Sequence, residues 1–389
     1  MAFTDLDALL TNEITTEKLK GCSIFVQKGN KTLFQKSYGS DKEDSIYKIY
    51  SMSKPITSVA IMILFERGLL TLQEPVSNYL PAYKNMKVVT PNGIEEAKNQ
   101  ITIKHLLDMT SGLCYPGETT LSERIMQDLQ HKMLGQVAAG KKLKTVEICN
   151  ILAQTPLEFE PGTSWKYGFS ADVLGAVVEV ISGMTYGDFL KKEIFTPLEM
   201  FDTDFLVPKE KLHRLAKMYS RNPKTGKCET PTPEKIHWLG LDEPSKAPNI
   251  ESGGGGLYST VKDYSNFARM LCNGGTFTNS KGEKVKILSK KTVNFMTKPN
   301  VSEMQKTSKY LINMDGYEYG NLLRIMTDLA KANSNGSLGE FGWDGLPGNY
   351  FMVDPEEDLI LVFLQHVAEG PDWILRNKYR QIVYSSLED

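Results

Sequence analysis

Apolar residues recur along the chain in patterns that predict a mixed protein of helices and strands. Met1 to Leu19 shows the spacing of an amphipathic helix. Two alternating segments, Cys22 to Gln27 and Thr32 to Tyr38, flank a Gly-Asn turn and predict a β-hairpin. The run from Pro55 to Gly68 is apolar on nearly every side, which predicts a central, buried helix.

The C-terminal third shows strand patterns again. Tyr350 to Val353 and Leu359 to Leu364 predict two strands, and Trp373 to Leu387 predicts a closing helix. Between the terminal regions, the signals from Asn92-Gly93 to about Trp238 are mostly those of helices and loops. We therefore expect a sheet domain formed by residues 1–80 and 240–389, and an inserted, mostly helical domain over residues 81–239.

Composition and charge narrow the possible partners. The 389 residues carry a formal net charge of −2, so nothing calls for nucleic acid or an anionic membrane as a partner. The basic run over residues 209–227 alternates with apolar residues and predicts a solvated helix face. No stretch approaches the ~18 apolar residues of a membrane span, and the N-terminus lacks the apolar core of a signal peptide.

Cysteine and histidine usage points to a cytoplasmic protein without a metal. The five cysteines are scattered and lack C-x-x-C spacing, which favours free thiols in a reducing compartment. The five histidines show no paired metal-ligand spacing such as H-E-x-x-H, so we expect no metal and no cofactor. A Ser-His-Asp triad would lack the G-x-S-x-G turn that usually presents its serine.

The candidate nucleophile is Ser51, in the S-x-x-K motif that ends at Lys54 and leads into the apolar helix. A serine hydroxyl is a poor nucleophile until a neighbouring base takes its proton. Positions i and i+3 share a helix face, so Lys54 can reach the Ser51 hydroxyl there. Pro55 is tolerated only in the first turn of a helix, which places Ser51 at the positive helix start.

Two other S-x-x-K matches have structural interpretations. Ser45 and Lys48 lie in an alternating stretch typical of a strand, where residues i and i+3 point to opposite faces. Ser259 precedes a predicted helix start at which Thr260 and Asp263 form a capping pair. The motif alone is therefore weak, and the neighbouring segments matter more.

Six segments follow one another in an order typical of a known superfamily. They are Ile49–Thr57; Gly68–Leu72 with Pro75-Val76 and Tyr79–Pro81; Ile101–Leu107 with Thr110–Leu113; Pro161–Tyr167 with Asp172–Gly175; Gly253–Thr260; and Gly342–Gly345. Together they cover nearly the whole chain and resemble the serine β-lactamase and penicillin-binding-protein superfamily. The resemblance is closest to the branch related to class C β-lactamases that includes the family VIII carboxylesterases.

The resemblance implies a fold and roles for individual residues. It implies a β-lactamase-like fold of the α/β (α+β) class, with an antiparallel sheet, flanking helices and an active site between the two domains. Tyr167 occupies the place of the second-motif tyrosine that moves protons beside the lysine. The backbone N–H groups of Ser51 and Leu346 would form the oxyanion hole. Gly253 to Gly256 would let the backbone approach the site closely.

Two motifs depart from the β-lactamase pattern. Phe169 stands where those enzymes carry Asn. The third motif is Trp343-Asp344-Gly345, where β-lactamases carry Lys-Thr-Gly or His-Thr-Gly and the esterase branch carries Trp-Gly-Gly. The cationic anchor for a substrate carboxylate is thus missing, an aromatic wall remains, and Gly345 allows close approach of the strand. Asp344 is unusual at its place and would repel an anionic substrate if it faced the site.

The sequence thus predicts a serine hydrolase that forms an acyl-enzyme, and most specifically a carboxylesterase acting on a small-molecule ester. One alternative is a β-lactamase, D-amino-acid peptidase or amidase on the same machinery. Another is a catalytically silent binding relative, against which the presence of Ser51, Lys54 and Tyr167 speaks. Oligomeric state and physiological substrate are left open by the sequence.

Overall fold

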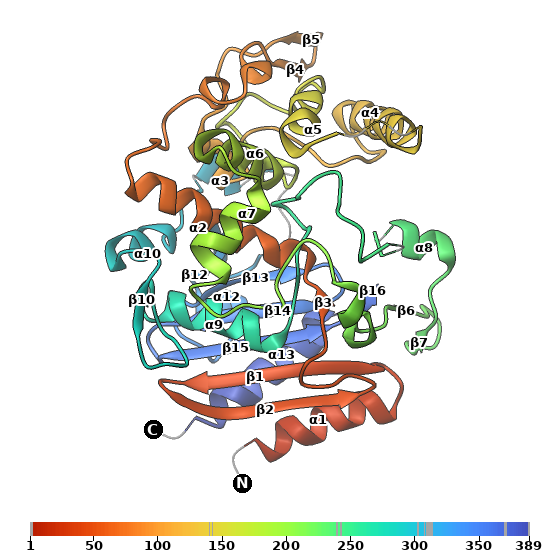
Figure 1. Cartoon of the computed structure of the whole chain (residues 1–389), viewed down its shortest axis with the longest axis vertical. Coiled ribbons are helices and arrows are strands. Elements are labelled where there is room, and N and C mark those ends of the chain that lie inside the picture. The colour runs from red at the N-terminus through yellow and green to blue at the C-terminus, as the bar shows by residue number, and fades with distance from the viewer. Residues whose placement is uncertain are drawn as a thin grey trace.

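Both ends of the chain contribute strands to one seven-stranded antiparallel sheet in the computed structural model of the protein (Figure 1). The N-terminal hairpin forms one edge and pairs through its first strand with a C-terminal strand. In sheet order the strands are β11 (Tyr317–Gly320), β12 (Leu323–Met326), β13 (Phe341–Gly345), β14 (Asn349–Asp354), β15 (Leu359–Gln365), β1 (Gly21–Lys28) and β2 (Lys31–Gly39). The fold class predicted from the sequence is confirmed.

The structure describes residues 3–139, 141, 143–238, 240–241, 243–301, 303–306, 308, 314–368 and 372–387. Within this part of the chain, the hairpin of β1 and β2 is the predicted one. Gly29 takes a left-handed φ of 55° in its turn, a conformation that glycine adopts without steric cost.

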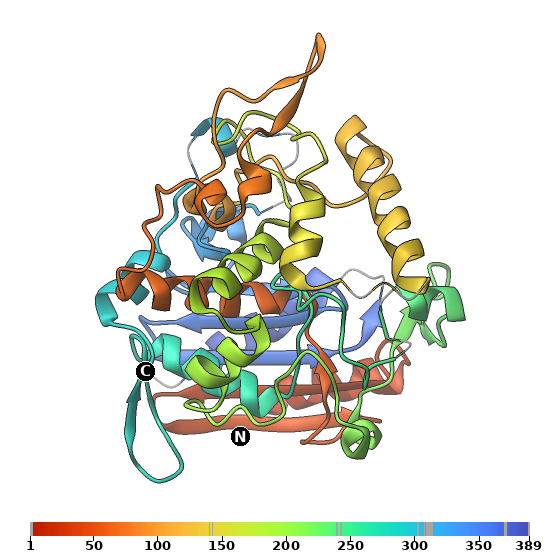
Figure 2. The same cartoon turned by 45° about the horizontal axis from the view of Figure 1, so that its top comes forward.

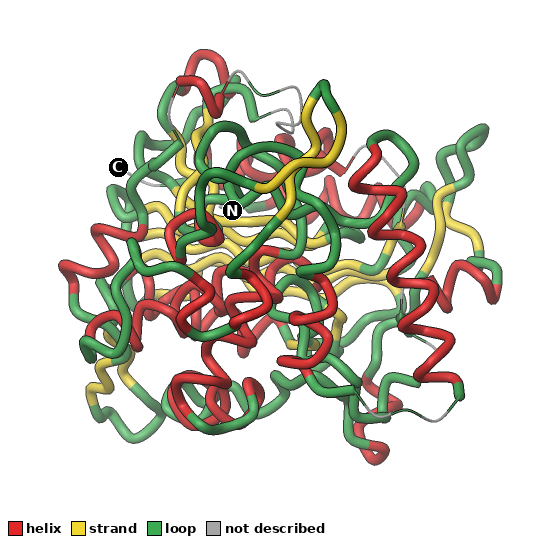
Figure 3. The backbone as a smooth tube through the Cα atoms, turned by 90° about the horizontal axis from the view of Figure 1, so that it is seen from above, coloured by secondary structure: helices red, strands yellow, loops and turns green. Residues whose placement is uncertain are grey.

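Helices cover both faces of the sheet. On one face, Val362 of β15 belongs to the core that includes α2 (Ser53–Glu66) and α9 (Val261–Cys272). On the other face, Leu361 packs in a second core with α1 (Thr4–Thr15) and α13 (Asp372–Ser385). Because β15 is buried on both faces, side chains on both of its sides meet apolar surroundings, which explains the uninterrupted apolar run from Leu359 to Leu364. Figure 3 shows the strands crossing the middle of the molecule among these helices.

Helix α2 is the central helix that the sequence predicts. Every residue from Ser53 to Leu64 is buried, and the helix contacts α6 (Ser170–Ser182) on the side away from the sheet. Figure 1 shows α2 between α6 and the strands. A helix enclosed in this way is apolar on nearly all sides, and its N-terminal end is buried within the molecule.

The segment expected as an insertion carries mostly helices and two short hairpins. One hairpin, β4 with β5, projects at the top of Figures 1 and 2, and α4 stands beside it. The elements are η3 (Pro81–Tyr83), β4 (Lys87–Thr90), β5 (Gly93–Glu96), α3 (Ile103–Leu107), α4 (Leu121–Ala138), α5 (Thr145–Leu152), α6, α7 (Tyr186–Leu190), η4 (Lys191–Phe195), η5 (Lys209–Arg214), β6 (Tyr219–Arg221), β7 (Cys228–Glu229) and α8 (Pro233–Trp238). The domain boundaries themselves stay a prediction.

Short elements connect these parts. They are β3 (Tyr47–Lys48), η1 (Tyr50–Met52), η2 (Val76–Asn78), β8 (Tyr258–Ser259), β9 (Thr276–Thr278), β10 (Lys284–Lys286), α10 (Lys290–Met296), α11 (Glu303–Lys306), α12 (Leu329–Ala332) and β16 (Val367–Ala368). No single helix in the described residues is long and apolar enough to span a membrane. By length and composition alone, the bent pair Ser170–Ser182 and Tyr186–Phe195 would suffice if its two helices were counted together.

The basic run over residues 209–227 is not the helix face that the sequence predicts. Only its first part is helical, as the short helix η5, and the chain then enters strand β6. The helix ends because the backbone beyond it pairs with Ile46, whose N–H donates to the Arg214 carbonyl and whose carbonyl accepts from Ala216. Arg214 is also held by ion pairs with Asp202 and Asp44.

Candidate active site

Ser51 lies at the entry to the buried helix α2, as its position before the apolar run predicts. Ile49 donates its N–H to the Leu257 carbonyl at 2.9 Å, which anchors the approach to the helix. Tyr50 then takes a left-handed φ of 45°, uncommon outside glycine and costing on the order of 1–3 kcal/mol. Ser51 follows in the short helix η1 (Tyr50–Met52), which runs directly into α2. The chain thus turns sharply at the residue before the candidate nucleophile.

Lys54 reaches Ser51 as the i, i+3 spacing predicts. Its Nζ donates hydrogen bonds to Ser51 Oγ at 3.2 Å, to the Tyr115 hydroxyl at 3.2 Å and to the Gly254 carbonyl at 2.6 Å. An ammonium group has three N–H donors, and these three contacts use all of them. The lysine side chain is fully buried, and a buried charge is tolerated only with such partners.

The glycine-rich segment 253–256 approaches the site closely, as expected. Thr57 of α2 donates its hydroxyl to the Gly253 carbonyl at 2.7 Å, one helical turn after the Lys54 contact with Gly254. A β-carbon on Gly253 would lie 2.4 Å from the Ala171 carbonyl oxygen, and one on Gly254 would lie 2.5 Å from Asp172 Oδ2. Glycine is therefore required here because α2 and α6 both press on the loop.

Tyr167 is brought to the same cluster. The Lys54 Nζ lies 4.5 Å from the centre of its ring. The indole N–H of Trp343 donates to the Tyr167 hydroxyl oxygen at 3.1 Å. This donor comes from β13, so the third motif contacts the second motif directly. An N–H aimed at a phenol oxygen stabilises the phenolate more than the phenol, because a charged acceptor strengthens a hydrogen bond.

Tyr115 belongs to the same cluster, although no motif in the sequence marks it. It lies in the loop after the Thr110–Leu113 segment, and its hydroxyl accepts from Lys54. Its ring packs edge-on against Tyr167, with centroids 5.7 Å apart, and against Phe169 at 4.7 Å. Phe169 therefore fills the place of the β-lactamase Asn with an aromatic wall, at the N-terminal cap of α6. The site contains two tyrosines beside the lysine.

Burial and neighbouring groups shift the pKa values of Lys54 and Tyr115. Burial alone would lower the pKa of Lys54, but the phenol groups of Tyr115 and Tyr167 and the carboxylate of Asp172 outweigh it, so the pKa is raised. Burial raises the pKa of Tyr115, and the Lys54 cation opposes that shift. Lys54 is therefore an ammonium at rest. Loss of one proton from Lys54 would leave a base beside Ser51, which is the state that a nucleophilic role for Ser51 would need.

The end of strand β13 lies against the chain that leads into Ser51. A β-carbon on Gly345 would lie 2.4 Å from the Ile49 carbonyl oxygen, so only glycine permits this approach. Leu346 follows at once, in the turn between β13 and β14, with a side chain that is half exposed. The assignment of the Ser51 and Leu346 N–H groups as an oxyanion hole is compatible with this approach and stays a prediction.

Asp344 is not brought to the site. Successive strand residues point to opposite faces of a sheet, and Trp343 takes the face toward Tyr167. Asp344 takes the other face, where Arg324 donates to its carboxylate at 2.8 Å and Arg376 at 2.5 Å. These cations hold the pKa of Asp344 below its ordinary value, although burial opposes them. The expected repulsion of an anionic substrate by Asp344 therefore does not follow from its position.

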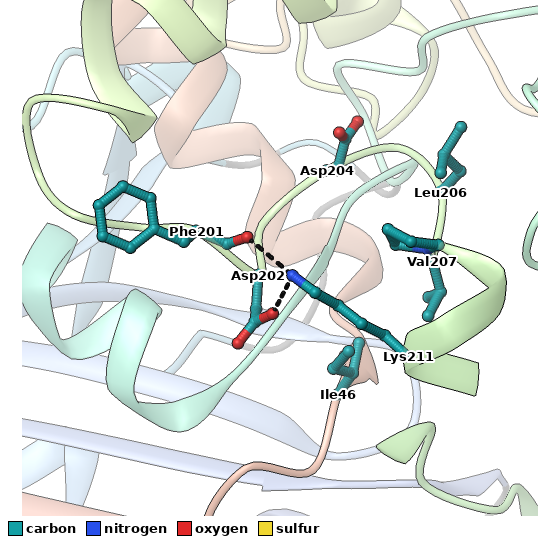
Figure 4. A pocket seen from close by; sticks show the side chains of 8 residues that line it. Ile46, Phe201, Asp202, Asp204, Leu206, Val207 and Lys211 are labelled. Carbon is teal, nitrogen blue, oxygen red and sulfur yellow. Dashed lines mark hydrogen bonds and ion pairs between the residues drawn. The ribbon is translucent and has the colours of Figure 1, made fainter. Parts of the chain in front are cut away.

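The other two S-x-x-K matches, at Ser45 and Ser259, lie in structural contacts. Ser45 Oγ accepts the Lys42 N–H, while Lys48 Nζ donates to the Gly240 carbonyl. Thr260 caps α9 by accepting the Asp263 N–H, as predicted. A small pocket shown in Figure 4 lies apart from the candidate residues, and its Lys211 is turned to Asp202 and the Phe201 carbonyl. The residues that line it are Ile46, Phe201, Asp202, Asp204, Leu206, Val207, Pro208 and Lys211.

Comparison with known sequences identifies relatives over nearly the whole chain. The profile of the family described as Beta-lactamase matches residues 6–385. Esterase EstB of Burkholderia gladioli is 26% identical over 406 residues, which cover 98% of this chain and 94% of that protein. An uncharacterized protein of Mycobacterium tuberculosis is 30% identical over 340 residues, which cover 84% of this chain and 79% of that protein.

Comparison with solved structures shows the same fold. EstCE1, described as a hydrolase with promiscuous acyltransferase activity, superposes with a TM-score of 0.79 at 21% identity, and 97% of each chain is covered. Simvastatin synthase LovD from Aspergillus terreus superposes with a TM-score of 0.80 at 19% identity, covering 99% of this chain and 98% of that one.

Proposed function

Because this chain belongs to the beta-lactamase family and is a serine hydrolase, we propose that it is a carboxylesterase acting on small esters. The observation that carries the proposal is the contact set of Lys54, whose ammonium group touches the Ser51 hydroxyl and a tyrosine hydroxyl at once. Such a nucleophile with an adjacent proton-moving pair is what acyl transfer requires.

The proposed reaction moves one proton at a time through this cluster. After the cluster has lost a proton, Ser51 Oγ gives its proton to Lys54 or to a tyrosinate and bonds to the ester carbonyl carbon. The tetrahedral oxyanion then collapses, the C–O bond to the alcohol breaks, and the alkoxide takes a proton back from the cluster. Water attacks the acyl-enzyme in the same way, releases the acid and returns the proton to Ser51 Oγ.

The preference for esters over β-lactams is supported by the third motif. Penicillins and cephalosporins carry a carboxylate beside the scissile amide, and Trp343 stands where a Lys or His would pair with it. Loss of a charge-assisted hydrogen bond corresponds to about 1.5–3 kcal/mol, or roughly one to two decades in rate. Phe169 supplies a ring where Asn would bind an amide side chain.

The proposal also includes a location and a partner. A cytoplasmic location is supported by the cysteine usage, and the five thiols are all free in the structure. The partner we propose is a small-molecule ester, with no nucleic acid and no membrane surface. No group of three or more potential metal ligands occurs among the described residues, and the proposed reaction uses only side chains and water.

A substrate panel tests the proposal. We expect kcat/KM for p-nitrophenyl acetate or butyrate to exceed that for nitrocefin by at least about tenfold, from the missing anion partner. Ser51→Ala should abolish ester hydrolysis. Ser53→Ala is the matched control and should retain most activity, because among the described residues Ser53 Oγ contacts the Leu257 N–H, from which it accepts a hydrogen bond, and not Lys54. A preference for nitrocefin would favour the β-lactamase alternative, and inactivity toward every acyl substrate would favour a silent relative.

A further inference from the structure

Asp172 is a buried carboxylate that the proposed reaction does not use. It lies in the first turn of α6 and is 2% exposed. Its Oδ1 accepts hydrogen bonds from the Ser252 hydroxyl and from the Gly254 N–H, the latter at 3.3 Å. Its Oδ2 has no hydrogen-bond partner among the described residues. A carboxylate without full pairing is costly to bury, which calls for an explanation.

Gly254 connects this carboxylate to the lysine through its two backbone polar groups. Its N–H points to Asp172 and its carbonyl accepts from Lys54 Nζ at 2.6 Å. These two groups belong to adjacent peptide units on either side of the Gly254 α-carbon, so the carboxylate and the ammonium fix the position of the same residue, each through a charge-assisted hydrogen bond. We propose that Asp172 is the positioning residue of Lys54: it orients the Gly254 carbonyl that holds the ammonium and supplies the buried negative charge that balances it.

Among the groups around Asp172, Lys54 is the cation whose charge affects the pKa of this carboxyl group. Burial raises the pKa of Asp172, while Ser252, the Lys54 charge and Gly254 oppose the rise. The neighbouring titratable groups on the other elements are phenols and a thiol, whose pKa values are all raised by burial, so they are neutral near pH 7. They are Tyr83, Tyr115, Cys149 and Tyr186. Glu179 lies farther along α6 and is held by the Tyr186 N–H.

Gly254 makes the arrangement possible. A β-carbon there would lie 2.5 Å from Asp172 Oδ2 and 3.1 Å from the Tyr115 hydroxyl oxygen. Both groups thus press on the same side of the Gly254 α-carbon. By contrast, a β-carbon on Gly255 would lie 3.7 Å from its nearest neighbour, the Tyr50 carbonyl carbon, an ordinary contact. The chain therefore offers a matched pair of glycines that differ in this contact.

The inference predicts a specific pH effect. Asp172→Asn keeps an acceptor for Gly254 but removes the charge, so the lysine–tyrosine cluster loses its proton more easily. The acid limb of kcat/KM for p-nitrophenyl butyrate should move to lower pH by about one unit, the scale of a nearby charge acting on a titrating group. KM should change little. Asp263→Asn is the control. Asp263 is also buried and accepts a backbone N–H, but its hydrogen bonds come from the Asp202 N–H and the Thr203 hydroxyl, away from Lys54.

The inference is overturned if the acid limb of Asp172→Asn stays at the wild-type pH, or if Asp263→Asn moves it equally. If Asp172→Asn does not fold, the activities of the two glycine variants test the inference instead. Gly254→Ala should lower kcat by about tenfold or more through a displaced Lys54, whereas Gly255→Ala should keep activity; equal activities would overturn the inference. It rests on the proposed function, whose failure shows separately as full activity in Ser51→Ala, as a preference for nitrocefin, or as an inactive wild type.

Discussion

The hydrogen bond from Trp343 to Tyr167 allows a direct test of which form of the tyrosine takes part in the reaction. Trp343→Phe removes the indole N–H that donates to the Tyr167 hydroxyl oxygen at 3.1 Å, while an aromatic ring stays in place. If catalysis passes through a Tyr167 phenolate, the lost bond is one to a charged acceptor and corresponds to about 1.5–3 kcal/mol. If the phenol stays neutral, the loss is about 0.5–1.5 kcal/mol.

A pH–rate profile distinguishes the phenolate from the neutral phenol, because the two cases predict different losses of kcat. If the Tyr167 phenolate takes part, kcat falls by roughly 10- to 150-fold. The acid limb of kcat/KM should also move to higher pH by about 1–2 units, because deprotonation of the cluster becomes harder. The direction is opposite to that expected for Asp172→Asn. The assay is hydrolysis of p-nitrophenyl butyrate over a range of pH, with melting temperature as the measure of folding.

Trp165→Phe is the matched control for this experiment. Trp165 is also buried and stacks on Tyr167, with ring centroids 6.0 Å apart, yet its indole N–H has no hydrogen-bond partner among the described residues. It should lose stability like Trp343→Phe without moving the acid limb. A Trp343→Phe enzyme with an unmoved limb and less than about a tenfold loss of kcat would refute the phenolate route.

Three further outcomes are expected. Lys54→Ala and Tyr167→Phe should each lower kcat at least ~10²-fold, the scale of lost acid–base catalysis, with little change in melting temperature. Tyr115→Phe should lower kcat about 10- to 150-fold, because Lys54 loses a charged hydrogen bond; unchanged activity would exclude Tyr115. Burial lowers the pKa of His366 to about 4. Its stabilising contribution is therefore full above about pH 6.5 and falls by about 3 kcal/mol toward pH 4. Denaturant unfolding should show this pH dependence in the wild type and its loss in His366→Gln.

The features that depend on residues close together in the sequence could be predicted from spacing alone. The contact of Ser51 with Lys54 follows from the i, i+3 relation at a helix start, and the terminal hairpin and the run of β15 follow from alternation and burial. Tyr167 and Trp343 were placed through resemblance to a family rather than through spacing, and the structure brings them together across 176 positions of the chain.

The remaining features depend on tertiary approach. Tyr115 lies in a loop without periodicity, so its contact with Lys54, 61 positions away, leaves no pattern in the sequence. The Gly254 carbonyl is a backbone group, which residue types do not reveal. Asp344 is different: strand alternation places it opposite its neighbour Trp343, and this rule alone would have directed it away from the site. Its two arginine partners come from β12 and α13, which only the folded sheet brings together.

Ser51 should be the residue that becomes acylated, and locating a covalent adduct on the protein tests this. The protein is treated with a fluorophosphonate probe, digested, and analysed by peptide mass spectrometry to locate the adduct. We expect one adduct on Ser51, formed more slowly in Lys54→Ala and absent in Ser51→Ala, with Ser53 unmodified. An adduct on any other serine, or labelling that persists in Ser51→Ala, would contradict it.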